Sequence, residues 1–169
     1  AHAGTGAVPP LFPRTMGPNA SKYVQQVLDS GITEDTVVRF EKAFAEELGV
    51  KHVVATPTCT TAMAVLALAF DFNHGDEVIV SPLTDYGSVY GLLVEHYIPV
   101  FPDTAPGTVN FSAETIEACI TDRTRAILAV HKCGLPNDMD AINELAAKHD
   151  IIVYEDCCQA AFTQYKGRD

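Results

Sequence analysis

The stretch HDIIVYEDCCQA, residues 149–160, decides the fold that the rest of the chain must share. Its middle, residues 151–156, is a continuous apolar run that ends in acids, and such a run predicts a buried strand. Asp156 stands at the end of that strand, and Gln159 follows after two cysteines. In parallel sheets, ligands bind beyond the carboxyl ends of the strands. The stretch therefore predicts a buried parallel strand that delivers an acid and an amide to a binding site.

Upstream of this stretch, apolar strand-like runs alternate with helical patterns. Strands are predicted over residues 52–56, 76–82, 98–102, 124–130 and 151–156. Helices are predicted over residues 60–70, 87–97, 112–120 and 138–149. A capping box of Ser112 and Thr115 marks the start of the third helix. Because the strand runs are continuously apolar, we predict an α/β fold of three layers, α/β/α, with a mostly parallel sheet.

The N-terminal part of the chain has a different pattern. Residues 1–19 are rich in proline and glycine and are expected to form an arm. Two helices should follow, the first capped near Asn19 or Ser21 and ended by Gly31, the second ended by Gly49. We expect residues 20–169 to form one domain, which is large enough for a substantial core.

Charge and composition exclude several classes of function. The chain carries 22 acidic against 11 basic residues, for a net charge of −11, and its basic residues do not cluster. Such a field disfavours nucleic acid as a partner. No run is apolar enough to span a bilayer, and the N-terminus carries no secretion signal, so we expect no membrane association. The five cysteines are odd in number and scattered, which predicts free thiols in a reducing compartment, the cytoplasm.

The first candidate site is the turn that follows the strand predicted over residues 52–56. Thr58, Cys59 and Thr60 open a helix there, and a hydroxyl-rich helix start offers free backbone N–H groups to a phosphate. The turn has neither a Walker lysine nor a G-x-G-x-x-G pattern, which excludes the usual nucleotide sites. Alternatively, the threonines only cap a buried helix.

Two further strand ends could share the same crevice. Asp85 and Tyr86 follow the second strand, either lining the crevice or capping a helix. Asp156 follows the last strand and could hold a ring nitrogen protonated, while Gln159 could donate to a phenolate-type oxygen. The alternative is that Asp156 caps a turn and Gln159 is solvated.

The same strand ends also carry possible metal ligands. His131 and Cys133 follow the fourth strand, and Cys157 and Cys158 follow the fifth. This spacing is not a usual zinc pattern, and buried free cysteine is common in protein cores. We therefore expect no metal.

Several motifs together resemble the DegT/DnrJ/EryC1/StrS aminotransferases, the sugar and aminocyclitol branch of the fold-type I pyridoxal-phosphate enzymes. They include FEKAFAEELGVKHVVAT, GDEVIVSPLT, GLPNDMDAINELAAKHDIIVYEDCCQA and YKGR. The most specific are the acid-x-x-Gln after the last strand and the PNDMDAI loop. The resemblance covers the chain from about residue 20 onward and implies pyridoxal 5'-phosphate as the cofactor.

The resemblance assigns roles position by position. The acid that pairs with the pyridine nitrogen falls on Asp156, and the glutamine near the ring oxygen falls on Gln159. The Ser-Gly-Thr phosphate turn falls on Thr58, Cys59 and Thr60, with a cysteine in place of glycine.

One further position departs from the family pattern. The aromatic residue that stacks on the ring falls on Asp85, which cannot stack, so Tyr86 would have to do so after a small shift.

The family's Schiff-base lysine lies beyond the last motif and is expected outside residues 1–169, because Lys166 falls in a surface hairpin turn. The chain is then an incomplete large domain, inactive alone, whose complement is a continuation or a second chain.

The resemblance implies amino transfer from glutamate or glutamine to a keto sugar or keto-cyclitol, in a homodimer. The alternative is a non-catalytic binding or assembly module that keeps the fold without the lysine.

Overall fold

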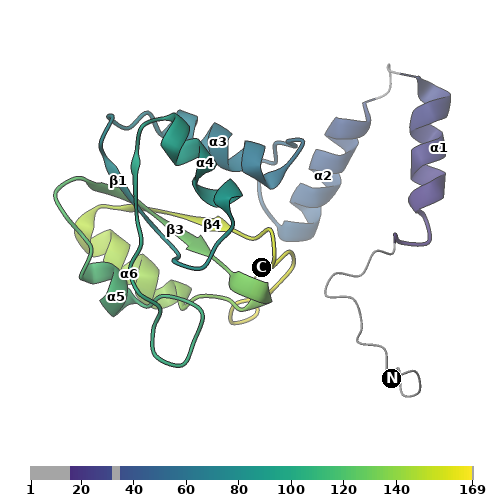
Figure 1. Ribbon diagram of the computed structural model, residues 1–169. Helices are drawn as coiled ribbons and strands as arrows, with labels where there is room; N and C mark the ends of the chain where they lie inside the picture. Colours follow the sequence, from purple (N-terminus) through teal and green to yellow (C-terminus); the bar gives the residue numbers. More distant parts are fainter. Residues whose placement is uncertain (1–15, 32–34, 169) are drawn as a thin grey trace, which may run out of the picture. The chain divides into compact units, whose positions relative to one another are not determined.

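The computed structural model of the protein describes residues 16–31 and 35–168 (Figure 1). Contacts divide the chain into a first unit that ends at Val53 and a second that begins at Val54. Most of the arm expected over residues 1–19 lies outside the described residues.

The first unit contains the two predicted helices. Helix α1 spans Ala20–Ser30 and ends at Gly31, and α2 spans Thr36–Leu48 and ends at Gly49. Gly49 adopts φ of 65° and donates its N–H to carbonyls of the last turn, which explains why a glycine stands there. Neither helix buries a side chain. Asn19 occupies the N-cap position of α1 without a side-chain hydrogen bond.

The second unit is built on a four-stranded sheet in which every strand pair is parallel. The strands are β1 (Glu77–Val80), β2 (Ile98–Val100), β3 (Thr124–Val130) and β4 (Ile152–Asp156). Their spatial order is β2-β1-β3-β4. Strand β3 ends in register with β4, and Val130 pairs with Asp156. The predicted parallel sheet is thus confirmed.

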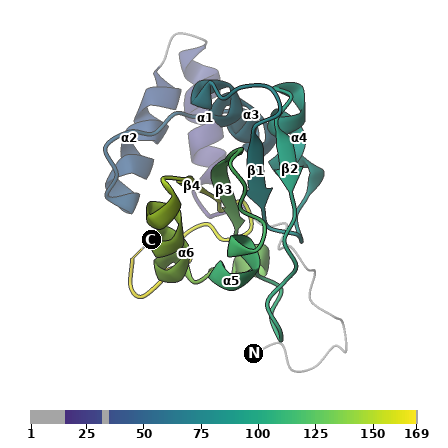
Figure 2. The ribbon, with the colours of Figure 1, turned by 90° about the vertical axis from the view of Figure 1, so that its left-hand side faces the viewer.

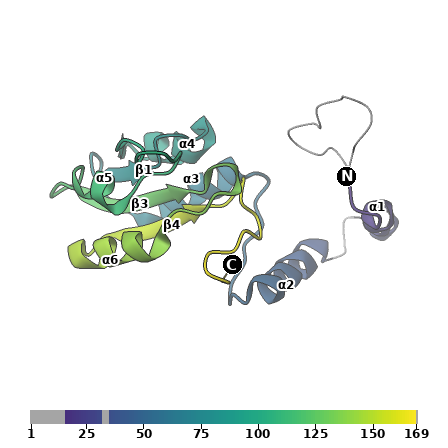
Figure 3. The ribbon, with the colours of Figure 1, turned by 90° about the horizontal axis from the view of Figure 1, so that it is seen from below.

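Helices cover both faces of this sheet. Helices α3 (Cys59–Phe70) and α4 (Tyr86–Val94) lie on one face, and α5 (Ala113–Glu117) and α6 (Met139–His149) lie on the other (Figures 1 and 2). Seen from below, β3 and β4 run between α4 and α6 (Figure 3). A short 3-10 helix, η1 (Lys132–Gly134), follows β3. The capping box predicted at Ser112 and Thr115 is present at the start of α5. The three-layer prediction is confirmed.

The two faces carry two separate hydrophobic clusters. Strands β1 and β3 contribute alternate residues to each, as the period of a strand requires. The cluster under α3 and α4 is formed by Met63, Ala67, Val78, Val80, Val89, Leu92, Tyr97, Ala126, Leu128 and Val130. The cluster over α5 and α6 is formed by Ile79, Phe111, Ile116, Ile127, Ala129, Met139, Ile142, Leu145, Ala146 and Ile151.

The strand predicted over residues 52–56 is wrong. The structure assigns no strand there, although the segment leads directly into α3 as expected. A β-branched apolar run becomes a strand only when another strand pairs with it. Among the described residues, the sheet consists of β1 to β4 only, and none of these strands pairs with residues 52–56.

Candidate functional site

The carboxylate of Asp156 is the centre of the site. Its side chain is buried at the end of β4. The Ser88 hydroxyl donates to Oδ2 at 2.7 Å, and the Cys158 backbone N–H donates to Oδ1 at 3.0 Å. The Cys59 thiol lies 3.5 Å from Oδ1. Within the described residues, no lysine, arginine or histidine forms an ion pair with this carboxylate.

The structure brings together the three segments that the sequence predicted to share a crevice. Cys59 opens α3, Ser88 lies in the first turn of α4, and both contact Asp156. The starts of α3 and α4 also touch, because a Cβ placed on Gly87 would lie 2.5 Å from Oγ1 of Thr60. Only a glycine at position 87 allows this approach.

The turn at the start of α3 is arranged as an N-terminal cap. Oγ1 of Thr58 accepts the N–H of Thr61 at 3.1 Å. The N–H groups of Cys59 and Thr60 occupy the first positions of the helix, where no intrahelical acceptor exists. The capping role that sequence reasoning held as the alternative is therefore real, and it still leaves two N–H groups for an anion.

Asp85 acts as the N-cap of α4. Its Oδ1 accepts the N–H of Gly87 at 2.9 Å, and Asp85 is exposed. Tyr86, the proposed aromatic substitute, is 63% exposed and packs edge-on against Tyr90 with ring centroids 6.0 Å apart. Neither contact involves Asp156.

Gln159 is held by the short helix η1. Its Oε1 accepts the backbone N–H of Cys133 at 2.9 Å, in η1. This bond uses the carbonyl of the amide as an acceptor and leaves its NH₂ group as a donor.

The Cys59 thiol is held in its protonated form at neutral pH, in which it is a poor nucleophile. Burial, followed by the nearby charge of Asp156 and the Cys158 thiol, raises the pKa of Cys59 to about 12. A protonated thiol is a weak donor. A stronger donor that approaches Oδ1 of Asp156 would therefore displace it.

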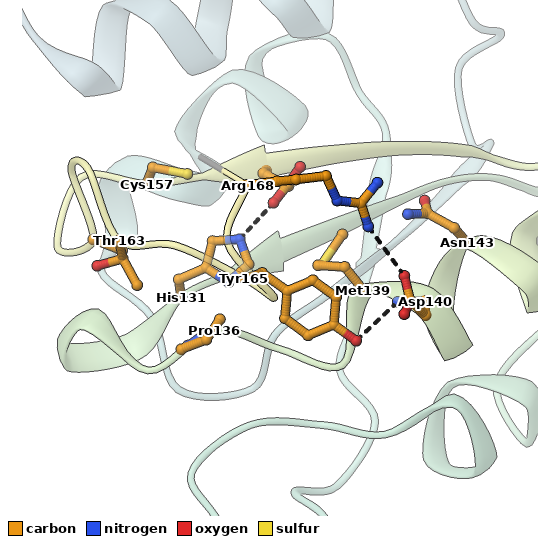
Figure 4. A pocket seen from close by; sticks show the side chains of 11 residues that line it. His131, Pro136, Met139, Asp140, Asn143, Cys157, Thr163, Tyr165 and Arg168 are labelled. Carbon is orange, nitrogen blue, oxygen red and sulfur yellow. Dashed lines mark hydrogen bonds and ion pairs between the residues drawn. The ribbon is translucent and has the colours of Figure 1, made fainter. Parts of the chain in front are cut away.

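A second polar cluster lies on the other face of β4, and sequence reasoning missed its arrangement. Glu155 points away from Asp156, as neighbours in a strand must. Nε2 of buried His131 lies 2.7 Å from Oε2 of Glu155. Together with Cys157, these residues line a cavity of about 220 Å³ beside α6 (Figure 4). An alternation of side-chain directions in β4 was the available signal.

The metal alternative based on His131, Cys133, Cys157 and Cys158 is wrong as a set. Cys157 lies with His131, whereas its neighbour Cys158 lies with Cys59 and Asp156. Cys133 belongs to neither group among the described residues.

Similarity to known proteins identifies the family of this chain. The model of the DegT/DnrJ/EryC1/StrS aminotransferase family matches residues 14–169. The chain belongs to the DegT/DnrJ/EryC1/StrS family.

Curated relatives of this family cover most of the chain. It is 40% identical over 159 residues to the GDP-perosamine synthase of Caulobacter vibrioides, covering 92% of this chain and 43% of that protein. It is 37% identical to the L-glutamine:2-deoxy-scyllo-inosose aminotransferase of Streptomyces lividus, and the match covers 94% of this chain and 39% of that protein. The chain thus spans about two fifths of these relatives.

A solved structure supports the fold. The E. coli GDP-4-keto-6-deoxy-D-mannose-3-dehydratase with bound hydrated PLP superimposes with a TM-score of 0.87 at 30% identity. The match covers 95% of this chain and 43% of that one. This structural neighbour was solved with PLP and is named for a reaction other than amino transfer.

The chemistry of two features can be compared with the needs of such a cofactor. A buried carboxylate without a cationic partner suits a protonated ring nitrogen. The start of α3 suits a phosphate. Lys166 contacts neither of them in the recorded ion pairs, and pairs with Asp140 of α6 in the hairpin turn of residues 165–168. No helix in the described part of the chain is both long and apolar enough to cross a membrane.

Proposed function

We propose that this chain supplies the cofactor-binding part of a pyridoxal 5'-phosphate-dependent aminotransferase. The reaction would move an amino group from glutamate or glutamine to a keto sugar or keto-cyclitol. The observation that carries the proposal is the contact between the end of β4 and the start of α3, where Cys59 lies 3.5 Å from Asp156. A carboxylate and a phosphate-binding turn that meet in this way can hold the two ends of one small cofactor.

Each residue of the site would then have a definite task. Asp156 would hold a proton on the ring nitrogen, which makes the ring an electron sink for amino transfer. The N–H groups of Cys59 and Thr60, with the Thr58 cap, would bind the phosphate. The amide of Gln159 would donate to the ring oxygen. Ser88 would fix the orientation of Asp156 through its 2.7 Å hydrogen bond.

The remaining parts of the proposal concern the rest of the protein. We infer that the cofactor-linking lysine lies outside residues 1–169, on a continuation or a second chain, and that residues 20–169 are the first part of the large domain. A homodimer is proposed, in keeping with the exposed apolar side chains of α4, which include Leu93 and Val94. All five cysteines are free, in keeping with a cytoplasmic location.

Addition of pyridoxal phosphate to the purified intact protein tests the proposal. We expect a visible absorption band that disappears after borohydride treatment or addition of an amino donor. Binding without a band sensitive to borohydride would replace the aminotransferase by a lysine-free, dehydratase-like enzyme. A protein that does not bind the cofactor at all would refute the proposal.

The second candidate, a non-catalytic module, is favoured by one specific observation. Asp85 caps α4 in the position where the family has a stacking aromatic residue, so the usual support of the ring is absent there. Failure of cofactor binding in the test above would support this candidate.

A further inference from the structure

Two groups of side chains at the end of β4 have the donor atoms of a metal site. The first group is Cys59, Asp156 and Cys158, and the second is His131, Glu155 and Cys157. In each group, the potential ligand atoms lie within 4.8 Å of one another. Proximity alone therefore does not distinguish the groups, but their hydrogen bonds do.

The hydrogen bonds of His131 exclude the second group. Its Nδ1 accepts the backbone N–H of Asn137 at 3.1 Å, so the neutral ring carries its proton on Nε2. A protonated nitrogen is no metal ligand. Nε2 therefore donates to Glu155 instead.

In the first group a metal ion has to displace the protons of two thiols, and one ligand separation fits zinc. Sγ of Cys59 and Oδ1 of Asp156 are 3.5 Å apart. In a tetrahedral site with Zn–S of about 2.3 Å and Zn–O of about 2.1 Å, the separation between sulfur and oxygen is about 3.6 Å. The carboxylate is already oriented by Ser88 and by the N–H of Cys158. These two hydrogen bonds hold a ligand in place as the outer partners of metal sites do.

The donor set and its surroundings select the class of ion. Two sulfur atoms and one carboxylate suit zinc-like, thiophilic cations and not magnesium or calcium, which prefer oxygen alone. Cys158 is exposed and gives the ion a path from solvent.

We propose that Cys59, Asp156 and Cys158 bind one thiophilic divalent cation of the zinc class in the cofactor-free protein, with a fourth position open to water. Binding forms two metal–sulfur bonds and one metal–oxygen bond, and the two thiol protons pass to solvent. Because Asp156 belongs to the proposed cofactor site, the cation and pyridoxal phosphate should exclude each other. This mutual exclusion rests on the proposed function.

Titration of the protein, freed of cofactor and metals under reducing conditions, with Cd²⁺ tests the site. Cd²⁺ reports sulfur ligands through an ultraviolet thiolate-to-metal absorption, and Zn²⁺ should displace it. We expect one tight equivalent. Cys59→Ser and Cys158→Ser should each weaken this binding by more than about tenfold.

Cys157→Ser is the matched control, because Cys157 neighbours a proposed ligand but belongs to the excluded group. It should leave Cd²⁺ affinity unchanged, and the thermal unfolding of all three variants shows whether each is folded. Equal weakening by Cys157→Ser, or normal affinity in folded Cys59→Ser, would overturn the proposal, since binding would then come from the adjacent exposed cysteines alone.

A competition experiment separates the metal site from the proposed function. Pyridoxal phosphate should lower the apparent Cd²⁺ affinity, and saturating Zn²⁺ should prevent cofactor binding. If the cysteine variants behave as expected but the cofactor fails to bind metal-free protein, the metal site stands and the proposed function falls. If the cofactor binds and Cd²⁺ affinity does not depend on Cys59, the proposed function stands and the metal site falls.

Discussion

At the scale of single residues, Asp156 is a buried carboxylate that accepts hydrogen bonds from several segments of the described chain. It is only 4% exposed, and three donors from separate segments converge on it: Cys59, Ser88 and Cys158. Sequence reasoning identified the residue from its place after an apolar strand. It did not identify Ser88 as a partner, because residues 68 positions apart meet only through the packing of α4 on the sheet.

Replacement of Asp156 by asparagine should separate catalysis from binding. Asparagine is nearly isosteric and keeps one accepting oxygen, while its NH₂ group can donate to the Ser88 hydroxyl; it no longer stabilises a proton on a ring nitrogen. Turnover of the intact protein should fall by about a hundredfold or more, while cofactor retention changes little. Steady-state kinetics and bound-cofactor absorbance measure the two effects. Normal turnover in Asp156→Asn would mean that another group interacts with the ring nitrogen.

Replacement of Thr60 by valine should have the opposite pattern. Its side chain lies against Gly87 at the start of α3, where the phosphate is proposed to bind. The isosteric valine keeps the packing and removes one hydroxyl donor, so cofactor affinity should fall by about tenfold. Equilibrium dialysis against pyridoxal phosphate measures the change. An unchanged affinity would remove Thr60 from the phosphate site.

At the scale of elements, the site exists because two helices start at the same place. Helices α3 and α4 cross closely, and a Cβ on Gly91 would lie 2.5 Å from Cα of Ala64. This contact brings the first turn of α4, with Ser88, against the start of α3. The sequence predicts both helices but gives no signal of how closely they approach.

Gly91→Ala should therefore destabilise the protein. Alanine improves helix propensity by about 0.5–1 kcal/mol, whereas overpacking against a backbone atom costs roughly 1–3 kcal/mol. We expect a net loss of about 1–2 kcal/mol and a melting temperature lower by several degrees. Gly17→Ala is the control, since a Cβ there meets no atom within 4 Å. Equal melting temperatures for Gly91→Ala and the wild type would contradict the close crossing.

The start of α6 should make a pH-dependent contribution to stability. The Tyr165 hydroxyl, and then the Ala141 N–H, donate to Asp138 and hold the pKa of its carboxyl below the usual range. Because the folded pKa is lower than the unfolded one, this stability is present above pH about 4 and is lost as the pH falls through the folded pKa. The effect is small, since Asp138 is exposed.

Asp138→Asn isolates that contribution, because asparagine caps a helix as well as aspartate does. Its melting temperature should be slightly below that of the wild type at pH 7, and the difference should shrink as the pH falls below about 4. Thermal unfolding followed by circular dichroism over a series of pH values measures this. A difference that does not change with pH would show that the charge of Asp138 is not its cause.

At the scale of the whole molecule, the two units differ in how much they bury. The second unit contains both hydrophobic clusters, and residues 126–129 at the centre of its sheet are fully buried. Helices α1 and α2 of the first unit bury no side chain, although Val24, Leu28 and Phe40 are apolar.

Amide hydrogen exchange should show this difference. Amides of β3 should exchange only through global unfolding, and those of α1 should exchange about a thousandfold faster or more. Mass spectrometry of peptides from the chain measures both. Equal protection of α1 and β3 in the intact protein would show that the apolar side chains of α1 are covered by a partner or by a further segment.

The sequence by itself determined the alternation of helices with β1 to β4 and the parallel sheet, because these follow from apolar periodicity and caps. The residues proposed for the cofactor came from the resemblance of its motifs to a known family. Only the tertiary structure decided that residues 52–56 form no strand, since a strand depends on a neighbour that the local sequence does not contain. The tertiary structure alone also separated Cys157 from Cys158. Adjacent side chains near the end of β4 point to opposite sides, so one thiol joins His131 and the other joins Cys59 and Asp156.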